Sequence, residues 1–387
     1  MHATSALSTD VLVIGAGPAG CACAFKLARL GVQATLAAMD TGKWRVGETC
    51  GPQVLNRLAS EGMPAPPEDL GLPILRYRSA WGNDDLEARD LRFWSAGDAL
   101  AIDRPRLERW LLAAARAIGV QVLDRCMIGG GQRIGQTWSI QGRLDTSSIE
   151  IAANFVIEAT GRVARSVLQS DATRSFSDRL MCLHTFVSDA GSDRSSVLVE
   201  ACPAGWWYAV PASNGQRLLA LFTDADLVGP RAERRQMFRA QLAATHHIRQ
   251  LALSAEPATE IQLCDARTGA RSLVWRDRWL SVGDAAWSID PLSGAGIQRS
   301  IGEALDAASA VVRFVADGNQ DSLRHHALGV GKSLLEALRR QSAYYEMEQR
   351  WPTRPFWRRR VAARAEVHRP EGVPRFRGAN VGPAWSS

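Results

Sequence analysis

A glycine pattern near the start of the chain constrains the fold more than any other feature of the sequence. The pattern G-x-G-x-x-G follows an apolar run at residues 11–14, which is typical of a parallel strand covered on both faces, and it opens a helical segment. In such a unit the first glycine permits a tight turn, the second lets a pyrophosphate approach the backbone, and the third lets helix and strand pack closely. Together with the free N–H groups of the helix N-terminus, the pattern predicts that a dinucleotide is bound by Gly15, Gly17, Pro18, Ala19 and Gly20.

One position departs from the usual form of this unit. The acidic residue that grips the ribose hydroxyls normally ends the second strand, but this chain has Ala38 there, and the nearest acid is Asp40. Either Asp40 takes this role from a shifted strand end, or main chain and water hold the ribose.

Two further fragments extend the pattern along the chain. The strand-like FVIEATGR at residues 155–162 ends in A-T-G, and WLSVGD at residues 279–284 ends in Gly283-Asp284. A glycine turn, then A-T-G, then G-D resembles the FAD-containing aromatic hydroxylase and halogenase superfamily over most of residues 10–325. The resemblance implies an α/β Rossmann-type FAD-binding domain with a glutathione-reductase-like parallel sheet, interleaved with an antiparallel-sheet substrate domain and followed by a C-terminal helical segment.

The resemblance also carries roles onto single residues. Asp284 would accept hydrogen bonds from the ribityl chain of FAD, and the loop after it would lie against the flavin ring, where amides stabilise negative charge on reduced flavin. The members of this loop are Pro291, Ser293, Gly294, Ala295 and Gly296. Arg104 occupies a place where relatives keep an arginine near the cofactor. Arg45, just before the segment Gly47-Glu48-Thr49, either touches the FAD diphosphate or lies on the surface.

The same pattern divides the chain into segments. We expect FAD-binding parts at residues 1–75, 101–172 and 271–325, and substrate-domain parts at residues 76–100 and 173–270. C-terminal helices are expected at residues 326–368 and a flexible Pro/Gly-rich tail at residues 369–387. Residues 173–270 alternate apolar and polar side chains between turn signals, which favours antiparallel strands.

Aromatic residues of the substrate segment are candidates for the pocket. GWWYAVP at residues 205–211 stands near the place where flavin halogenases carry W-x-W-x-I-P, so Trp206, Trp207 and Pro291 are predicted to line a pocket for a planar substrate. At least one tryptophan must be core, because alternate strand residues face opposite ways. His184 is a weak candidate for a base over the pocket, and a packed histidine is the alternative.

Lysine usage distinguishes two kinds of flavin chemistry. Halogenases need a lysine to carry or steer hypohalous acid. The three lysines are Lys26, Lys43 and Lys332, and none lies in the stretch after the G-E-T segment, near ILRYRSAWG at residues 74–82, where a halogenase lysine would be expected. Arginine cannot replace lysine as a nucleophile because it stays protonated. The resemblance therefore favours oxygen insertion: a flavin C4a-hydroperoxide hydroxylates an electron-rich ring, with NAD(P)H as the external electron donor.

The last resemblance concerns the substrate. D-P-L-S-G-A-G at residues 290–296, W-W-Y-A-V-P, and YYEMEQRWPTRPFWRRR at residues 344–360 resemble flavoproteins that mature tryptophylquinone cofactors in amine dehydrogenases and amino-acid oxidases. This implies that the substrate is a tryptophan borne by a partner polypeptide, which the basic C-terminal region could attract. The alternatives are a monooxygenase, reductase or halogenase-like enzyme acting on a free small molecule, and a flavin-binding assembly factor without turnover.

Composition excludes several other classes. The chain has no apolar run of the roughly 18 residues that a membrane helix needs and no secretory signal pattern, so a cytoplasmic protein without membrane contact is expected. The net charge of +6 comes without any nucleic-acid recognition motif, so no nucleic-acid partner is expected. Seven cysteines without metal-site spacing predict reduced thiols and no metal site.

Overall fold

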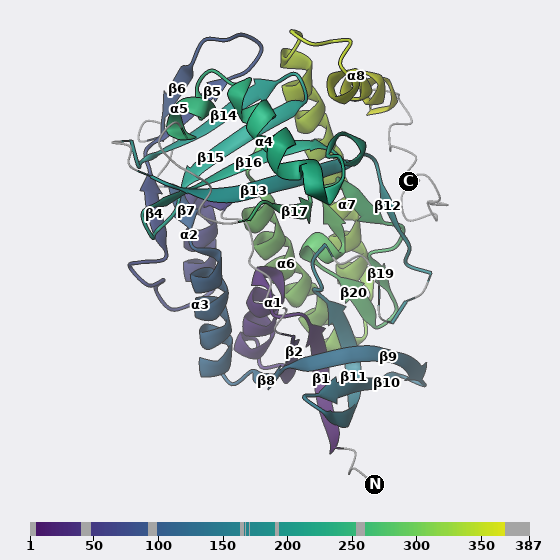
Figure 1. The fold of residues 1–387 in the computed structure, drawn as a ribbon. Helices are drawn as coiled ribbons and strands as arrows, with labels where there is room; N and C mark the ends of the chain where they lie inside the picture. The colour runs from purple at the N-terminus through teal and green to yellow at the C-terminus, as the bar shows by residue number, and fades with distance from the viewer. Residues whose placement is uncertain are drawn as a thin grey trace.

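The computed structural model describes residues 5–39, 48–91, 99–162, 166, 168–169, 171–189, 193–252 and 260–367. The chain folds around two large sheets that lie one above the other in Figure 1, with long helices beside and between them. No helix in these ranges combines the length and the apolar character that crossing a bilayer requires.

The first sheet has eight strands and contains the parallel core. Its main order is β19-β20-β11-β1-β2-β8, and the strands from β11 to β8 run parallel to their neighbours, as does β20 to β11. The antiparallel strands β9 and β10 extend from β11. The bounds are β1 Ser5–Ile14, β2 Ala34–Ala38, β8 Gln121–Asp124, β9 Cys126–Ile134, β10 Thr137–Leu144, β11 Ser147–Glu158, β19 Trp275–Arg276 and β20 Trp279–Ser281.

Three helices bury one face of this sheet. They are α1 Pro18–Arg29, α3 Arg104–Ala117 and α6 Gly296–Asp317, and α1 lies against both of the others. Their small and aliphatic side chains share one core with β1 and β11, including Val11, Val13 and Ile157. This explains why residues 11–14 read as a continuous apolar run: both faces of β1 are covered.

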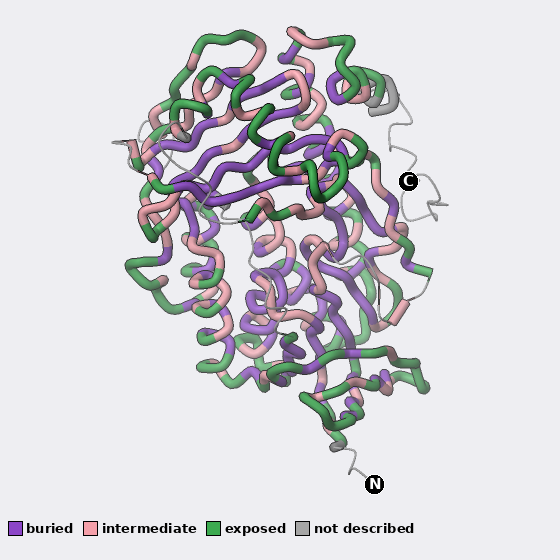
Figure 2. The backbone as a smooth tube through the Cα atoms, viewed as in Figure 1, coloured by how far each residue is buried: buried purple, intermediate pink, exposed green. Residues whose placement is uncertain are grey.

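The second sheet has seven strands in the order β17-β13-β16-β15-β14-β5-β6, antiparallel except for β14 and β5. Figure 2 shows that its central strands are buried along most of their length. The bounds are β5 Arg76–Ala80, β6 Glu87–Asp90, β13 Leu180–Ser188, β14 Ser196–Cys202, β15 Gly205–Pro211, β16 Gln216–Asp224 and β17 Gln262–Asp265.

The two faces of the second sheet are covered differently. The outer face packs against α4 Arg234–Ala243 and α5 Ile248–Ala252, with Phe238 and Ile248 in the core. The inner face packs against the C-terminal helices α7 Asp321–Met347 and α8 Pro355–Val367 and against Leu292. The inner face is therefore the one that looks toward the predicted flavin loop.

Shorter elements join the two halves. One three-stranded sheet consists of β3 Glu48–Cys50, β7 Ala99–Ile102 and β4 Gly71–Ile74, and another of β12 Arg174–Phe176, β18 Gly269–Arg271 and β21 Trp287–Ser288. The remaining helices among the described residues are α2 Pro52–Ser60 and the 3₁₀ turns η2 Ala225–Leu227, η3 Arg231–Glu233, η4 Gly283–Ala285 and η5 Pro291–Ser293. The predicted fold class is confirmed, while the division of the chain into folding units stays a prediction.

Candidate functional site

The glycine turn brings α1 into contact with the end of β11. Gly15 has φ +110°, and a Cβ there would lie 2.5 Å from the carbonyl oxygen of Ala159. A Cβ at Gly20 would lie 1.8 Å from the carbonyl oxygen of Gly15. Both positions therefore require glycine, because any side chain would push helix, turn and A-T-G loop apart.

The N-terminus of α1 is open to an anion. Gly17 is the N-cap and offers no side chain to the first-turn N–H groups, and Pro18 follows it. Nearby, Thr160 of the A-T-G loop buries its Oγ1 without a hydrogen-bond partner among the described residues. Free helix N–H groups and an orphaned hydroxyl are the groups that a phosphate would satisfy.

The predicted ribityl ligand Asp284 lies in η4, where the G-D motif follows β20. A Cβ at Gly283 would lie 2.9 Å from the Cβ of Ala19, so the G-D turn packs against the start of α1. Glycine turn, A-T-G loop and G-D turn thus meet at the carboxyl ends of β1, β11 and β20, the edge where open α/β sheets bind ligands.

Arginines surround the Asp284 carboxylate. Arg162 Nε lies 3.1 Å from Oδ2, Arg299 pairs with Oδ1, and Arg174 donates to the Asp284 carbonyl at 2.7 Å. Although burial opposes it, the charges of Arg162, Arg299, Arg174 and Arg104 hold the pKa of Asp284 below its ordinary value. Asp284 stays ionised, and its side chain keeps 26% of its surface exposed.

These residues fit FAD. Arg162 and Arg299 at the Asp284 carboxylate and Arg174 at the Asp284 carbonyl carry one positive charge more than Asp284 and Glu303, the second partner of Arg299, balance. A diphosphate would offset this charge, and the orphaned Thr160 hydroxyl and the α1 N-terminus offer donors to it. Asp284 remains able to accept hydrogen bonds from hydroxyl groups on its exposed side. Arg104 acts on the same carboxylate, because its positive charge helps to lower the pKa of Asp284. Its Nε pairs with Glu108 Oε1 at 2.9 Å.

The predicted ring-facing loop ends at the start of α6. Asp290 caps η5 by accepting from Leu292 N at 2.9 Å, and Gly294 turns the chain with φ +62°. Ala295 is the N-cap of α6 and makes no side-chain capping bond, so the amides of this long helix begin uncapped. Pro291 and Gly294 are exposed, whereas Ala295 and Gly296 are half-buried. The loop thus places small residues, Gly294, Ala295 and Gly296, beside a helix N-terminus, an arrangement that suits a flavin ring.

A buried polar network connects this loop to the C-terminal helix α7. Tyr345 of α7 donates to the Asp290 carboxylate, and Trp206 Nε1 donates to the Tyr345 hydroxyl at 3.1 Å. Burial raises the pKa of Asp290 to about 6, against the hydrogen bond from Tyr345, which lowers it. Burial and the nearby Asp290 also raise the pKa of Tyr345.

The structure corrects the prediction for the two tryptophans. Trp207 is fully buried on the outer face, edge-on to Phe238 with ring centroids 4.8 Å apart. Trp206 points to the inner face but is only 1% exposed, because it stacks on Phe222 at 4.0 Å and contacts Tyr345. Neither ring has a face left for a substrate, and Trp206 instead anchors the network beneath the loop.

Two tyrosines offer aromatic surface where the tryptophans do not. Tyr208 of β15 lies on the same face as Trp206, two residues along the strand, and is half-buried. Tyr77 of β5 donates to Thr49 Oγ1 at 2.8 Å, and burial is the main cause that raises the pKa of Tyr77. Thr49 Oγ1 lies 3.8 Å from where a Cβ on Gly294 would be, so Tyr77 reaches the flavin loop through Thr49.

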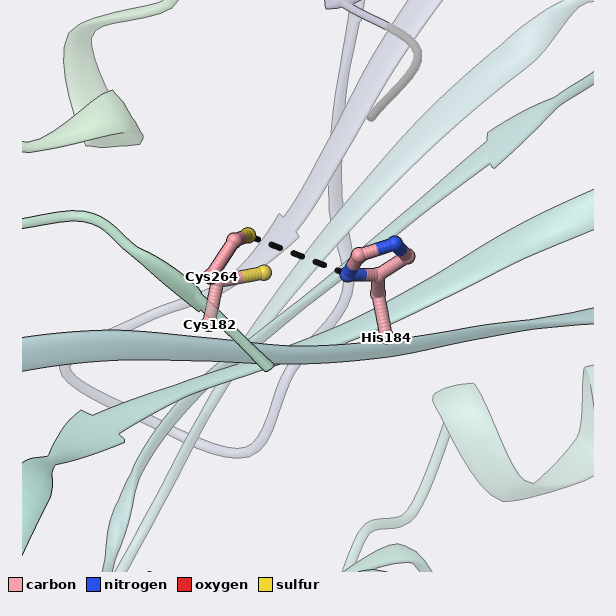
Figure 3. Close-up of side chains that lie close together, drawn as sticks. All are labelled: Cys182, His184 and Cys264. Atoms are coloured by element: carbon pink, nitrogen blue, oxygen red, sulfur yellow. Dashed lines mark hydrogen bonds between the residues drawn. The ribbon is translucent and has the colours of Figure 1, made fainter. Parts of the chain in front are cut away.

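His184 is part of a compact cluster. It is 4% exposed on β13, and its Nδ1 lies 3.8 Å from Cys264 Sγ of β17, with Cys182 beside both (Figure 3). This places His184 on the inner face, as a base over the pocket requires, but the ring faces two thiols.

The C-terminal arginines are mostly engaged within the molecule. Arg350 pairs with Glu348, Arg359 Nη1 lies 2.7 Å from Asp224 Oδ2, and Arg360 Nη2 lies 2.9 Å from Asp224 Oδ1. The Arg359 and Arg360 pairs fasten α8 to the end of β16. Only part of the predicted basic surface, such as the exposed Arg354 and Arg358, is left for a partner.

Sequence reasoning missed several site residues, and two predicted ones cannot be placed. Asp40 and Arg45 lie outside the described residues, so their roles at the ribose and the diphosphate remain predictions. Arg162 follows A-T-G directly and Arg299 lies in the first turn of α6, so the motifs themselves could have indicated both. Tyr345 gave no local signal, because its partner Asp290 is 55 residues away.

Comparisons with known proteins agree with this geometry. The FAD binding domain family matches residues 8–326. LodB of Marinomonas mediterranea, named as an FAD-dependent oxidoreductase, is 26% identical over 370 residues, covering 93% of this chain and 99% of LodB. The structure of the peptidyl tryptophan dihydroxylase QhpG, essential for tryptophylquinone cofactor biogenesis, is 25% identical with a TM-score of 0.75, covering 92% of this chain and 79% of QhpG. The myxobacterial chondrochloren halogenase CndH shares the fold with a TM-score of 0.80 at 20% identity, covering 92% and 86%.

Proposed function

Since the chain belongs to the FAD binding domain family, we propose that it is a monooxygenase that hydroxylates a tryptophan carried by a partner polypeptide during tryptophylquinone formation. The family and its relatives make the chain an FAD-dependent oxidoreductase. The proposal of a tryptophan in a polypeptide as the substrate is based on the similarity to QhpG along 92% of the chain. The positions of the three lysines in the sequence support hydroxylation over halogenation.

The lysines argue against halogenation. Lys26, in the last turn of α1, pairs with Glu61, Lys332 lies in α7, and Lys43 lies outside the described residues. None lies in the stretch after the G-E-T segment, near residues 74–82, where the superfamily's halogenation chemistry would need one. That stretch holds Tyr77 instead, whose hydroxyl donates to Thr49 Oγ1 at 2.8 Å, while Tyr208 packs on the inner face of the second sheet.

In the proposed reaction, the chain's own residues would bind FAD, orient the substrate ring and exclude water. FAD would supply the two-electron chemistry that activates O₂, with NAD(P)H as the proposed external donor. The arginine group around Asp284 and the glycine turn would hold it. The uncapped N-terminus of α6 would stabilise negative charge at its ring, and the Asp290–Tyr345–Trp206 network would keep that loop in place. Tyr208 and Tyr77 would form the aromatic wall that orients an indole ring and excludes water.

A second candidate is a halogenase-like enzyme for a free small molecule. The fold of CndH favours it, as does the tryptophan 2-halogenase of Chondromyces crocatus, which is 24% identical over 330 residues, covering 80% of this chain and 62% of that protein. A flavin-binding assembly factor without turnover is the third possibility. It predicts that the bound flavin is not reduced by NADH or NADPH.

Co-expression with a candidate partner polypeptide, taken from the proteins encoded by the neighbouring genes, tests the proposal. We expect one tryptophan of that polypeptide to gain oxygen, seen by mass spectrometry of its peptides, and we expect no gain when this chain is omitted. A matched arm with free tryptophan and bromide separates the alternatives. Bromination of the free amino acid would favour the second candidate, and normal maturation of the polypeptide without this chain would contradict the proposal.

A further inference from the structure

Three soft or borderline metal ligands meet on the inner face of the second sheet. Cys182 and His184 are two residues apart on β13, so both side chains point to the same face. Cys264 of β17 is the direct cross-strand partner of Cys182. The Sγ atoms of the two cysteines and one ring nitrogen of His184 all lie within 4.8 Å of one another (Figure 3).

The sheet register disfavours a disulfide at this pair. Ala266 N donates to Leu180 O at 3.2 Å, so the directly opposed pair Leu180 and Ala266 is hydrogen-bonded. Pair types alternate along an antiparallel ladder, so Cys182 and Cys264, two positions on, form a pair of the same type. Cβ atoms in such pairs are about 5.5 Å apart, whereas a disulfide needs about 3.8 Å.

The same spacing suits a bridging metal ion. Zn–S bonds of about 2.3 Å and Zn–N bonds of about 2.0 Å at tetrahedral angles put two sulfurs about 3.8 Å apart, and a sulfur and a nitrogen about 3.5 Å apart. Cys264 Sγ and His184 Nδ1 are 3.8 Å apart. A small inward movement of the side chains would therefore complete three corners of a tetrahedron.

The surroundings also suit a Zn²⁺ ion. Cys182 and His184 are buried, and Cys182 and Cys264 pack among apolar side chains of the inner face, including Trp206, Phe222 and Leu292. Two thiolates would neutralise the charge of the ion in this apolar setting.

We propose that Cys182, His184 and Cys264 bind one Zn²⁺ ion, with its fourth position open to water or to a donor atom of a bound ligand. A three-ligand set of this kind is typical of zinc sites that keep an exchangeable position. The ion would fasten the edge strand β17 to β13 and lie on the sheet face that packs against the flavin loop. This inference does not depend on the proposed hydroxylation.

The sequence predicts no metal site because the local spacing of its cysteines is not that of one. Cys264 and His184 are 80 residues apart in the chain, so local spacing cannot reveal this cluster. The short pattern Cys-x-His on a strand was the only local signal.

The test uses the purified full-length protein. After treatment with EDTA, Zn²⁺ is titrated in competition with a chromophoric chelator, and the zinc-loaded protein is examined by X-ray absorption. We expect one equivalent of Zn²⁺, with two sulfur ligands and one nitrogen ligand from the chain. Cys264→Ser and His184→Gln should each weaken binding by at least about 100-fold, whereas Cys126→Ser, a buried cysteine of β9, should leave it unchanged.

Several results would overturn the proposal. The first is a Zn²⁺ affinity of the wild-type protein no higher than that of Cys264→Ser. The second is an X-ray absorption spectrum with only nitrogen and oxygen ligands. The third is a loss of Zn²⁺ binding in Cys126→Ser as large as in Cys264→Ser. Cys264 lies on an edge strand and is only partly buried, so its serine variant is the one most able to fold. If a variant does not fold, the absorption spectrum of the wild-type protein still decides the ligand set.

Discussion

The two large sheets build their parts of the site in different ways. The first sheet uses backbone: turns at the ends of β1, β11 and β20 approach one another so closely that Gly15, Gly20 and Gly283 have no room for a side chain. The second sheet uses side chains on one face, such as Trp206 and Tyr208, whose neighbours come from distant helices and loops. Changes to the first region should therefore act through steric clash, and changes to the second through lost contacts and altered ionisation.

The largest effect is expected at Gly20. In Gly20→Ala the new Cβ would meet the Gly15 carbonyl oxygen at 1.8 Å, so helix and turn must separate. We expect a loss of more than about 4 kcal/mol of stability together with loss of bound flavin, measured by urea unfolding and by flavin absorbance. Gly302→Ala in α6 is the control, because a Cβ there meets nothing within 4 Å. A Gly20→Ala protein as stable and as yellow as that control would refute the backbone account.

The ionisation of Asp290 is the next effect in size. Its folded-state pKa of about 6 exceeds the unfolded value of about 3.9, so the folded protein binds more protons between these values. Its contribution to stability is therefore full below about pH 4 and is lost as the pH rises through about 6. Relative to Asp290→Asn, the wild-type protein should lose about 3 kcal/mol over this range.

Unfolding curves of both proteins across the pH range measure this difference. Asp178, Arg360 and Tyr345 also act on Asp290, so the comparison with the asparagine variant is needed to isolate it. If the free energy of unfolding depends on pH in the same way in both proteins, the pKa of Asp290 is not raised by folding, which would contradict this account.

Asp284→Asn should weaken flavin binding about ten- to hundredfold, because a charged acceptor for the ribityl hydroxyls is lost. Folding should change less, since the carboxylate is partly exposed. Flavin fluorescence titration of the apoprotein measures the affinity. Asp306→Asn in the same helix-rich region, at a 63% exposed carboxylate paired with Arg57, should bind flavin like the wild type. Equal affinities for all three proteins would remove Asp284 from the site.

The smallest effect concerns the hydroxyl of Tyr345. Tyr345→Phe leaves Trp206 Nε1 and the Asp290 carboxylate without this partner, which should cost about 1–2 kcal/mol of unfolding free energy. Tyr344→Phe changes the neighbouring, exposed ring and should be neutral. If the two variants unfold alike, the network contributes nothing beyond packing.

The difference between the regions also explains what the sequence could predict. The first sheet and its ligand edge were predictable, since a required glycine and a buried parallel strand leave local marks at residues 11–20 and 283–284. The antiparallel sheet was predictable from alternation, but the pocket wall was not. Whether Trp206 faces a ligand or a neighbour depends on Phe222 and Tyr345, which only tertiary packing brings to it. The Cys182–His184–Cys264 cluster was hidden for the same reason.

Oxygen transfer itself is the most direct test of the proposed function. The purified, FAD-loaded protein would be incubated with NADH or NADPH, ¹⁸O₂ and the candidate partner polypeptide, with chloride and bromide present, and the partner's peptides would be analysed by mass spectrometry. We predict that ¹⁸O enters one tryptophan of the polypeptide, that free tryptophan is left unchanged, and that no halogen is incorporated. Halogen in the product, ¹⁸O in free tryptophan alone, or a reduced flavin that reacts with O₂ without labelling the polypeptide would contradict it.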